Sequence, residues 1–427
     1  MAPPIEDHPL RYRLANELHA RPFPALSAPC TGLFLAIKQP EGAIGRDRAA
    51  DRAHLIDFLD RYGAPHPSPG ATHYYGKVGR VFLKWESHTE FVTYTAFQDG
   101  VGERPFDPQD FEIFPQDWLN GAPGVRLTSA LIRVEQSKSA DEIRSSLKDW
   151  FVQESVAVSQ VLDEAATLAG DFRIDPAGHM RFAVFCDPAT GDRRVGRIVQ
   201  RLCEIETYKS MSMLGFARVQ SLSRRMGEID QKLSNLVDRM SSEHGAAEET
   251  LTELLTISAE LENLNAQAAF RFGATEAYSA LVDQRIDVLR EERFNGRQTF
   301  REFMMRRFDP AMRPVNATQR RLAQMADRAI RAGDLLRTRV DVERQAQNQK
   351  LLESMDRRAD LQLRLQRTVE GLSVVAISYY AVNLVVYTFG PVAERVDISK
   401  ILLTGLATPL VILSVWGLVR RIRKSVE

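Results

Sequence analysis

The chain has 427 residues, enough for two or three folded units with sizeable cores. It carries 56 Lys and Arg residues against 56 Asp and Glu residues; this balance argues against a protein that coats nucleic acid and against an acidic disordered scaffold, so no nucleic-acid partner is predicted. Its three cysteines, Cys30, Cys186 and Cys203, are odd in number and far apart, which argues against a disulfide-stapled secreted fold and suits a reducing compartment.

Prolines divide the chain into two parts. Sixteen of the 20 prolines lie at or before Pro188, and none occurs between Pro188 and Pro310. Because proline breaks helix interiors but punctuates strands and turns, the first part is predicted to be mixed and the second to consist of long helices. We therefore predict an α+β domain over residues 1–190, followed by a helical bundle or coiled-coil stalk over residues 191–370.

Strand and helix patterns follow one another in the first part. Val81, Leu83 and Trp85 alternate with polar residues, as in a half-buried antiparallel strand, so residues 73–97 predict a β-meander. The other predicted elements are strands at 31–38, 126–135 and 181–186, and helices at 48–62 and from 140 to about 168.

In the second part, apolar residues recur at alternating spacings of four and three, which predicts helices packed along apolar seams. Residues 241–245 interrupt the pattern, and Pro310 with Pro314 marks a second break, so the last soluble helix is predicted over 315–370. An intramolecular bundle and self-association through the same seams both fit. The seam residues are Leu222, Met226, Ile229, Leu233, Leu236 and Met240, then Leu254, Ile257, Leu261, Leu264 and Ala268, then Leu322, Met325, Ala329, Ala332 and Leu336.

Two uncharged apolar runs lie near the C-terminus, at residues 371–393 and 401–419. As helices they would measure ~35 and ~28 Å, close to the roughly 30 Å hydrocarbon core of a bilayer. We predict two transmembrane helices joined by an external loop at 394–400, with the lipid bilayer as partner. Two buried core helices are the alternative.

Basic residues flank this pair of runs on both sides, and the tail at 420–427 is basic. Because positive charge marks cytoplasmic flanks, both chain ends are predicted to face the cytoplasm. The first residues lack an apolar segment preceded by basic residues, so no export signal is predicted. In a bacterium the membrane would be the inner membrane. The flanking residues are Arg357, Arg358, Arg364 and Arg367 on one side and Arg420, Arg421, Arg423 and Lys424 on the other.

Asn383 is the conspicuous polar residue of the first apolar run, which makes it a candidate intramembrane polar site. An amide in hydrocarbon needs a hydrogen-bond partner. A bond between helices and a place on a polar path for an ion are the two interpretations.

No standard catalytic motif occurs: a Walker loop, GxGxxG, HExxH, CxxC and GxSxG are all missing from the sequence, so no catalytic residue is assigned. The candidate ligand-binding residues are His19, Arg21, His88 and Glu90. If His88 and Glu90 lie in extended chain they share a face and could hold a metal or relay a proton, whereas in a turn they diverge. The metal, the cofactor and any protein partner stay unknown.

Four segments together resemble a bacterial family of membrane-anchored proteins, domain-of-unknown-function family 3422, over nearly the full length. They are residues 15–23 (ANELHARPF), 84–91 (KWESHTEF), 200–217 (QRLCEIETYKSMSMLGFA) and 337–380, which begins RTRVDVERQ and ends in VVAISYY. The resemblance implies membrane anchoring and no particular activity.

The order of parts is also similar to that of CorA-type magnesium channels. That family carries a Gly-Met-Asn signature at the external end of its first span, whereas Asn383 here lacks the Gly-Met pair and lies in mid-span. Three hypotheses result. The first is a non-enzymatic, oligomeric scaffold or ligand- or partner-binding protein at the cytoplasmic face of the inner membrane. The second is a CorA-like divalent-cation channel or transporter, and the third is an enzyme in which the four candidate residues converge.

Overall fold

The computed structural model describes residues 5–17, 23–40, 45–136, 139–241, 247–395 and 399–426. The chain divides into two compact units. The first comprises Met1–Glu243 and Thr252–Ala332, and the second comprises His244–Leu251 and Gly333–Glu427.

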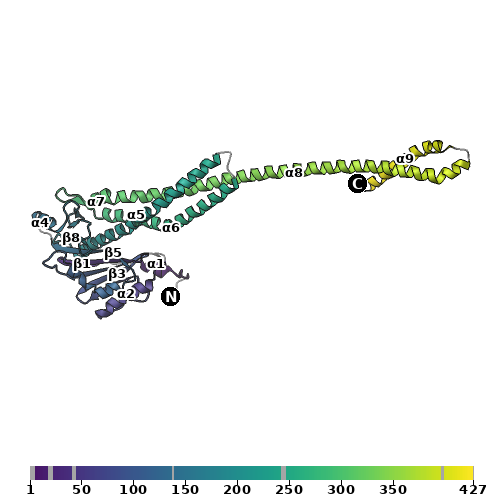
Figure 1. Cartoon of the computed structure of the whole chain (residues 1–427). Helices are drawn as coiled ribbons and strands as arrows, with labels where there is room; N and C mark the ends of the chain where they lie inside the picture. The colour runs from purple at the N-terminus through teal and green to yellow at the C-terminus, as the bar shows by residue number, and fades with distance from the viewer. Residues whose placement is uncertain are drawn as a thin grey trace. The chain divides into compact units, whose positions relative to one another are not determined.

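The first unit is built on a nine-stranded sheet in the order β2-β3-β4-β1-β5-β8-β7-β6-β9 (Figure 1). Neighbouring strands are antiparallel except β5 and β8, which are parallel. The mixed α+β class is confirmed, as are the three single strands and the meander expected from alternation. The strands are β1 (Cys30–Lys38), β2 (His73–Val78), β3 (Val81–Ser87), β4 (Phe91–Asp99), β5 (Val125–Gln136), β6 (Ala157–Val161), β7 (Ala166–Gly170), β8 (Met180–Cys186) and β9 (Glu292–Arg293).

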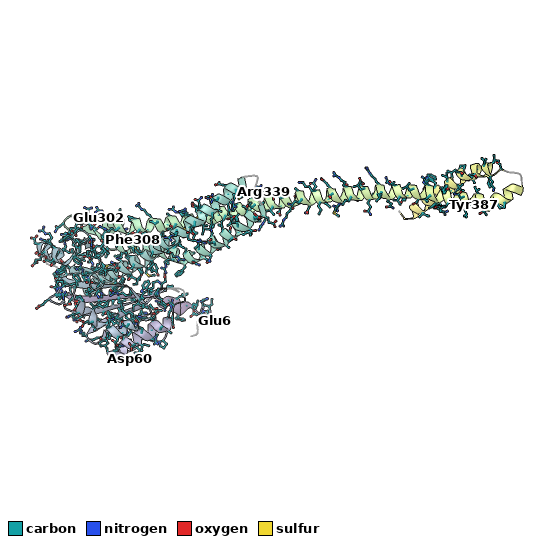
Figure 2. All side chains as sticks on the ribbon, in the orientation of Figure 1. Glu6, Asp60, Glu302, Phe308, Arg339 and Tyr387 are labelled. Carbon is teal, nitrogen blue, oxygen red and sulfur yellow. The ribbon has the colours of Figure 1, made fainter. Side chains whose placement is uncertain are left out.

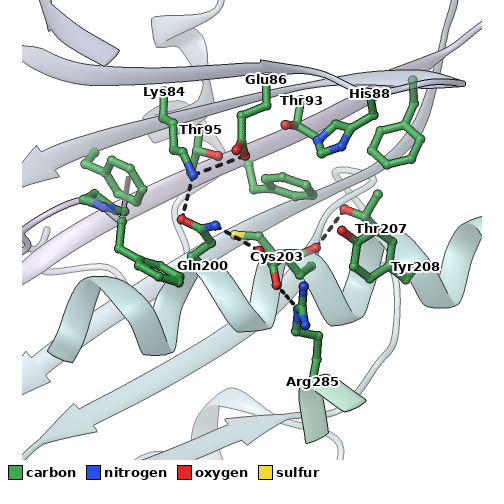
Figure 3. A pocket seen from close by; sticks show the side chains of 16 residues that line it. Lys84, Glu86, His88, Thr93, Thr95, Gln200, Cys203, Thr207, Tyr208 and Arg285 are labelled. Atoms are coloured by element: carbon green, nitrogen blue, oxygen red, sulfur yellow. Dashed lines mark hydrogen bonds and ion pairs between the residues drawn. The ribbon is translucent and has the colours of Figure 1, made fainter. Parts of the chain in front are cut away.

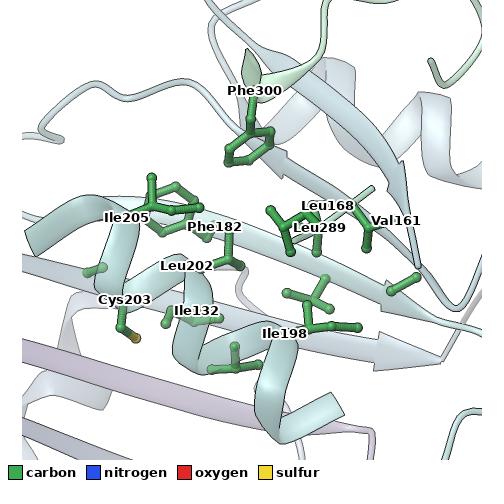
Figure 4. Packing of buried hydrophobic residues seen from close by; sticks show 14 of the residues in the cluster. Ile132, Val161, Leu168, Phe182, Ile198, Leu202, Cys203, Ile205, Leu289 and Phe300 are labelled. Atoms are coloured by element: carbon green, nitrogen blue, oxygen red, sulfur yellow. The ribbon is translucent and has the colours of Figure 1, made fainter. Parts of the chain in front are cut away.

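Helices cover both faces of the sheet. On one face, Phe58 and Trp118 belong to a buried cluster with Trp85 of β3. On the other face, Ile198 and Leu202 of the first turns of α5 pack over the central strands (Figure 4). Helices therefore cover both faces of the sheet, which explains why the central strands are nearly continuous apolar runs. The helices on the first face are α2 (Arg48–Arg61), α3 (Gln116–Asn120) and α4 (Ala140–Trp150). Those on the second face are α5 (Asp192–Ser241) and α7 (Phe300–Arg307). Helix α1 spans Arg11–Glu17, and a 3₁₀ helix spans Pro108–Ile113.

The helix predicted from 140 to about 168 is wrong beyond its first eleven residues. It begins as expected, with Ser139 and Glu142 forming a capping box, and ends at Trp150. The remainder is the hairpin of β6 and β7, which turns through three consecutive residues with positive φ, beginning at Leu162. Because both faces of this hairpin are buried, its apolar run carries no period that separates strand from helix.

Three helices of the first unit run side by side beyond the sheet (Figure 1): α5, α6 (Ala247–Asp287) and the beginning of α8 (Asp309–Arg395). Seam residues such as Ile229, Leu261 and Met325 are buried between them. Ion pairs cross the same contacts, including that of Asp230 on α5 with Arg321 on α8 at 2.5 Å. These seams are therefore buried within one chain, as in the intramolecular alternative.

Helix α8 begins six residues earlier than the predicted start at 315. Pro310 occupies its first turn, where a backbone N–H has no acceptor within the helix, so a proline there costs nothing. Pro314 lies one turn further on and removes one hydrogen bond without ending the helix. At its other end α8 continues through the predicted boundary at 370 to Arg395 as one helix of 87 residues.

The second unit consists largely of helix with exposed side chains. Residues 341–369 of α8 are all exposed, and side chains project from every side of the helix between Arg339 and Tyr387 (Figure 2). Helix α9 spans Lys400–Val426. Two helical stretches, Asp309–Pro391 and Lys400–Ile422, are long and apolar enough to cross a membrane, and only 6 % of the apolar window in each is buried.

Candidate functional site

A cavity of about 230 Å³ lies in the first unit between the sheet and α5. Strand alternation creates it: Leu83 and Trp85 of β3 point into the core, so Lys84 and Glu86 point to the opposite face. There they meet α5 in place of the apolar side chains that fill this layer elsewhere. The described residues that line the cavity are Phe23, Pro24, Phe34, Lys84, Glu86, His88, Phe91, Thr93, Thr95, Phe97, Gln200, Cys203, Glu204, Thr207, Tyr208 and Arg285.

A chain of polar contacts crosses the cavity wall from the sheet to two helices (Figure 3). The Nζ of Lys84 donates to Oε1 of Gln200 at 2.6 Å and lies 3.2 Å from a carboxylate oxygen of Glu86. The Nε2 of Gln200 donates to Glu204 at 2.9 Å, and Glu204 accepts from Arg285 of α6. The wall therefore holds two cations and two carboxylates whose charges compensate one another.

Strand β4 supplies hydroxyl groups opposite this chain. Thr95 and Thr93 pair across the ladder with Lys84 and Glu86, and all four side chains line the cavity. Both threonines are 6 % exposed. Within the described ranges, neither hydroxyl has a hydrogen-bond partner in the protein. Hydroxyl groups that line a cavity without a protein partner are available to a bound molecule.

His88 and Glu90 lie in the short connection between β3 and β4 and separate from one another. The His88 ring stacks on Phe91 with 4.4 Å between centroids and lines the cavity. The Glu90 carboxylate instead pairs with Arg271 of α6. Burial, reinforced by the Glu90 charge, raises the pKa of neighbouring Tyr278 well above its usual 10. The turn geometry therefore sends one candidate into the cavity and the other into a structural ion pair.

Of the three other sequence-predicted residues, the structure describes only Asn383. His19 and Arg21 lie outside the described residues. The Asn383 side chain donates to the backbone oxygen of Tyr379, one turn earlier in the same helix, at 3.1 Å. That bond lies within one helix and uses one of the two N–H donors of the amide. Among the residues that the structure describes, no three His, Cys, Asp or Glu side chains gather as metal ligands.

Sequence reasoning missed most of the cavity wall. Gln200 and Glu204 are four residues apart and so share one face of α5, but polar pairs at this spacing are common on exposed helices. Lys84 and Glu86 were visible as the polar half of an alternating strand, which normally faces water. No local signal separates these residues from an ordinary exposed polar face.

A second set of buried polar groups supports the fold. His54 contacts the Tyr94 hydroxyl through Nδ1 and the Trp118 backbone oxygen through Nε2, each at 3.0 Å. Its ring also stacks on Trp118 at 3.9 Å between centroids. Burial lowers the pKa of His54, so the neutral ring is favoured. With both nitrogens occupied and no exposed edge, this histidine joins α2 to β4 and α3.

Comparison with curated proteins gives no match, and comparison with solved structures gives none either. The similarity to CorA-type channels therefore has no support. One family model matches residues 6–426, nearly the whole chain, and its description is "Protein of unknown function (DUF3422)". The resemblance carried by the four sequence segments is confirmed, and the chain belongs to the DUF3422 family.

Proposed function

We propose that this protein is a non-enzymatic scaffold, anchored by two spans in the bacterial inner membrane and self-associated at the cytoplasmic face. The proposal retains the spans at 371–393 and 401–419, the external loop at 394–400 and the cytoplasmic tail at 420–427. It also places the sheet domain (1–190) and the helical region (191–370) in the cytoplasm.

The observation that carries the proposal is the exposure of the apolar helices. Leu372, Val375 and Tyr387 of α8 and Ile401 and Trp416 of α9 are all more than half exposed. A core helix of a soluble protein would bury such side chains, and a signal sequence would lie near the N-terminus. Lipid is the environment that can cover a helix that is apolar on all sides.

Self-association is supported by the stretch of α8 that precedes the first span. Seven large apolar side chains there are each 53–66 % exposed. At about 100° per residue they cover an arc of roughly 200°, and charged residues such as Glu353, Asp360 and Arg367 occupy the other side. We call this arc the α8 stripe. Its residues are Leu351, Leu352, Met355, Leu361, Leu363, Leu365 and Val369.

A second copy of the chain is the partner that fits the α8 stripe. Leu336 and Val340, earlier on the same helix, are buried and fall on the same arc, so the stripe continues an existing packing seam. Two copies inserted in one membrane in the same orientation bring their stripes together in parallel and at the same depth. A single helix in water is marginally stable, and each fully buried Leu contributes about 1.5–3 kcal/mol.

Anchoring and orientation are tested together in bacterial cells that produce the full chain. We expect the protein to stay in the membrane fraction after an alkaline wash. A fluorescent protein fused after residue 427 should fluoresce, and alkaline phosphatase inserted in the 394–400 loop should be active. Recovery of the chain in the wash supernatant would refute anchoring, and an active phosphatase fused at the C-terminus would refute the orientation.

Self-association is tested by disulfide crosslinking in intact membranes. The three native thiols are buried, so one introduced cysteine supplies the reactive group. Leu351→Cys on the stripe should give a covalent dimer under mild oxidant, whereas Glu353→Cys, about 200° away around the helix, should not. The same contrast is expected between Leu365→Cys and Arg367→Cys. Equal dimer yields from stripe and control positions would contradict the proposal.

A further inference from the structure

The cavity between β3–β4 and α5 has features of a ligand site rather than of a packing defect. Voids left by imperfect packing are apolar and small, whereas this cavity measures about 230 Å³ and has charged and hydroxyl groups on its wall. Placing Lys84, which is 5 % exposed, between a sheet and a helix costs desolvation energy that an apolar residue would avoid. Because this desolvation energy opposes folding, the polar wall is expected to have a role other than stabilising the fold.

The charge balance of the wall indicates which ligands it fits. Lys84 and Arg285 carry two positive charges, and Glu86 and Glu204 carry two negative charges, joined through Gln200. A charged ligand would bring one unmatched charge into a site whose own charges are already compensated. Burying an unmatched charge is strongly unfavourable, so the wall favours a neutral molecule.

The hydrogen-bonding groups of the wall indicate hydroxyl-rich chemistry. An ammonium has three N–H donors, and two of those of Lys84 are directed at Gln200 and Glu86, which leaves one. Thr93 and Thr95 can each donate and accept. A ligand hydroxyl can accept from an ammonium while donating to a carboxylate, which matches these alternating donors and acceptors.

Aromatic rings also line the cavity. Phe34, Phe97 and Tyr208 line it, together with Phe91, whose ring is stacked on His88. A flat aromatic surface suits the apolar C–H face of a ring whose edge carries hydroxyl groups. On β4, Phe91 and Phe97 flank Thr93 and Thr95 on one face of the strand, so the wall offers aromatic rings beside hydrogen-bonding groups.

We infer that this cavity binds a neutral polyhydroxylated ring compound of monosaccharide size, held by Lys84, Glu86, Thr93 and Thr95 and packed against Phe91. If the proposed function holds, this site would let a small molecule bind to the membrane-anchored scaffold. Binding at the cavity does not itself depend on membrane anchoring or on self-association.

The test uses the full chain in phospholipid nanodiscs, because sugar-headed detergents would compete for the site. Calorimetric titration with neutral hexoses and inositols, at millimolar concentrations, is compared with titration of a hexose phosphate, an amino sugar and amino acids. We expect saturable binding of at least one neutral compound and weaker or no binding of its charged analogues. Binding of charged compounds alone, or of none of the neutral ones, would overturn the inference.

A conservative variant locates the binding. Thr95→Val keeps the shape of the side chain and removes one hydroxyl from the wall, so affinity should fall about tenfold with little change in the unfolding temperature. Thr167→Val is the control, because Thr167 is also buried on a strand, with 6 % exposure, and does not line the cavity. Wild-type affinity in Thr95→Val, or an equal loss in both variants, would overturn the assignment to this cavity.

Discussion

Gly215 of α5 lies directly against Thr275 of α6. A Cβ atom built at position 215 would lie 2.2 Å from the Thr275 hydroxyl oxygen and 2.9 Å from its Cβ, closer than any real contact. Thr275 is 2 % exposed and has little room to move. The glycine is therefore what allows the two helices to approach at this level of the bundle.

We expect Gly215→Ala to destabilise the first unit by about 1–3 kcal/mol, because the added methyl group overpacks the contact. Gly227→Ala, three turns further along the same helix, is the matched control. Position 227 is exposed and has no atom within 4 Å of a built Cβ, so alanine there should stabilise by about 0.5–1 kcal/mol. Denaturant unfolding followed by tryptophan fluorescence measures both changes, and similar effects at the two positions would contradict this account.

The unfolding free energy should depend on pH through buried histidines. Burial lowers the pKa of both His54 and His179 below the usual 6.5. Both therefore bind a proton more readily in the unfolded chain. The contribution of these two rings to stability is fully present above about pH 6.5 and declines as the pH falls below it. We expect a lower unfolding temperature at pH 5.5 than at pH 7.5.

Replacing one of these histidines separates its share of the pH effect. His54→Gln should lower stability at pH 7.5, because the ring stacked on Trp118 is lost, and should reduce the drop between pH 7.5 and pH 5.5. His8→Gln changes an exposed histidine and should leave the drop as in the wild type. If His54→Gln and the wild type lose the same stability on acidification, burial of this ring is not the cause.

The three thiols should be inert in the folded protein. Burial raises the pKa of Cys30 and Cys186 to about 12, and burial also raises that of Cys203. The thiolate is the reactive form, so a thiol reagent at pH 8 should label none of them within minutes and all three after unfolding in guanidinium. Rapid labelling of one thiol before unfolding would show that its segment opens locally.

The ion pair of Arg46 with Asp51 should stabilise the fold by holding Arg46 against the segment that connects β3 and β4. Its side chains are 2 % and 4 % exposed, and Arg46 also donates to Ser87 and to the His88 backbone oxygen. Asp51→Asn leaves a buried guanidinium without its counter-charge, which should cost about 3–5 kcal/mol. Arg46→Met combined with Asp51→Leu should cost less than Asp51→Asn alone, as measured by denaturant unfolding. A larger cost for the double variant would show that the guanidinium hydrogen bonds matter more than the charge pairing.

Several features of this protein could be predicted from the sequence because they depend on residues close together in the chain. The apolar runs at 371–393 and 401–419 are recognisable by length and absence of charge. The alternation around Val81 and Leu83 is enough to place a strand, and heptad spacing is enough to place the helices of the bundle. The β6–β7 hairpin was missed because a segment buried on both faces loses the alternation that identifies a strand.

The cavity depended on the tertiary structure. Lys84 meets Gln200 across 116 residues of sequence, and Glu204 meets Arg285 across 81. Each of these residues on its own matches an ordinary exposed position on a strand or helix. Whether the polar half of β3 faces water or a helix is decided by where α5 and α6 pack, and that packing is driven by apolar contacts spread over the whole sheet. Local sequence therefore determines which residues share a face, and only the assembled layers determine what that face meets.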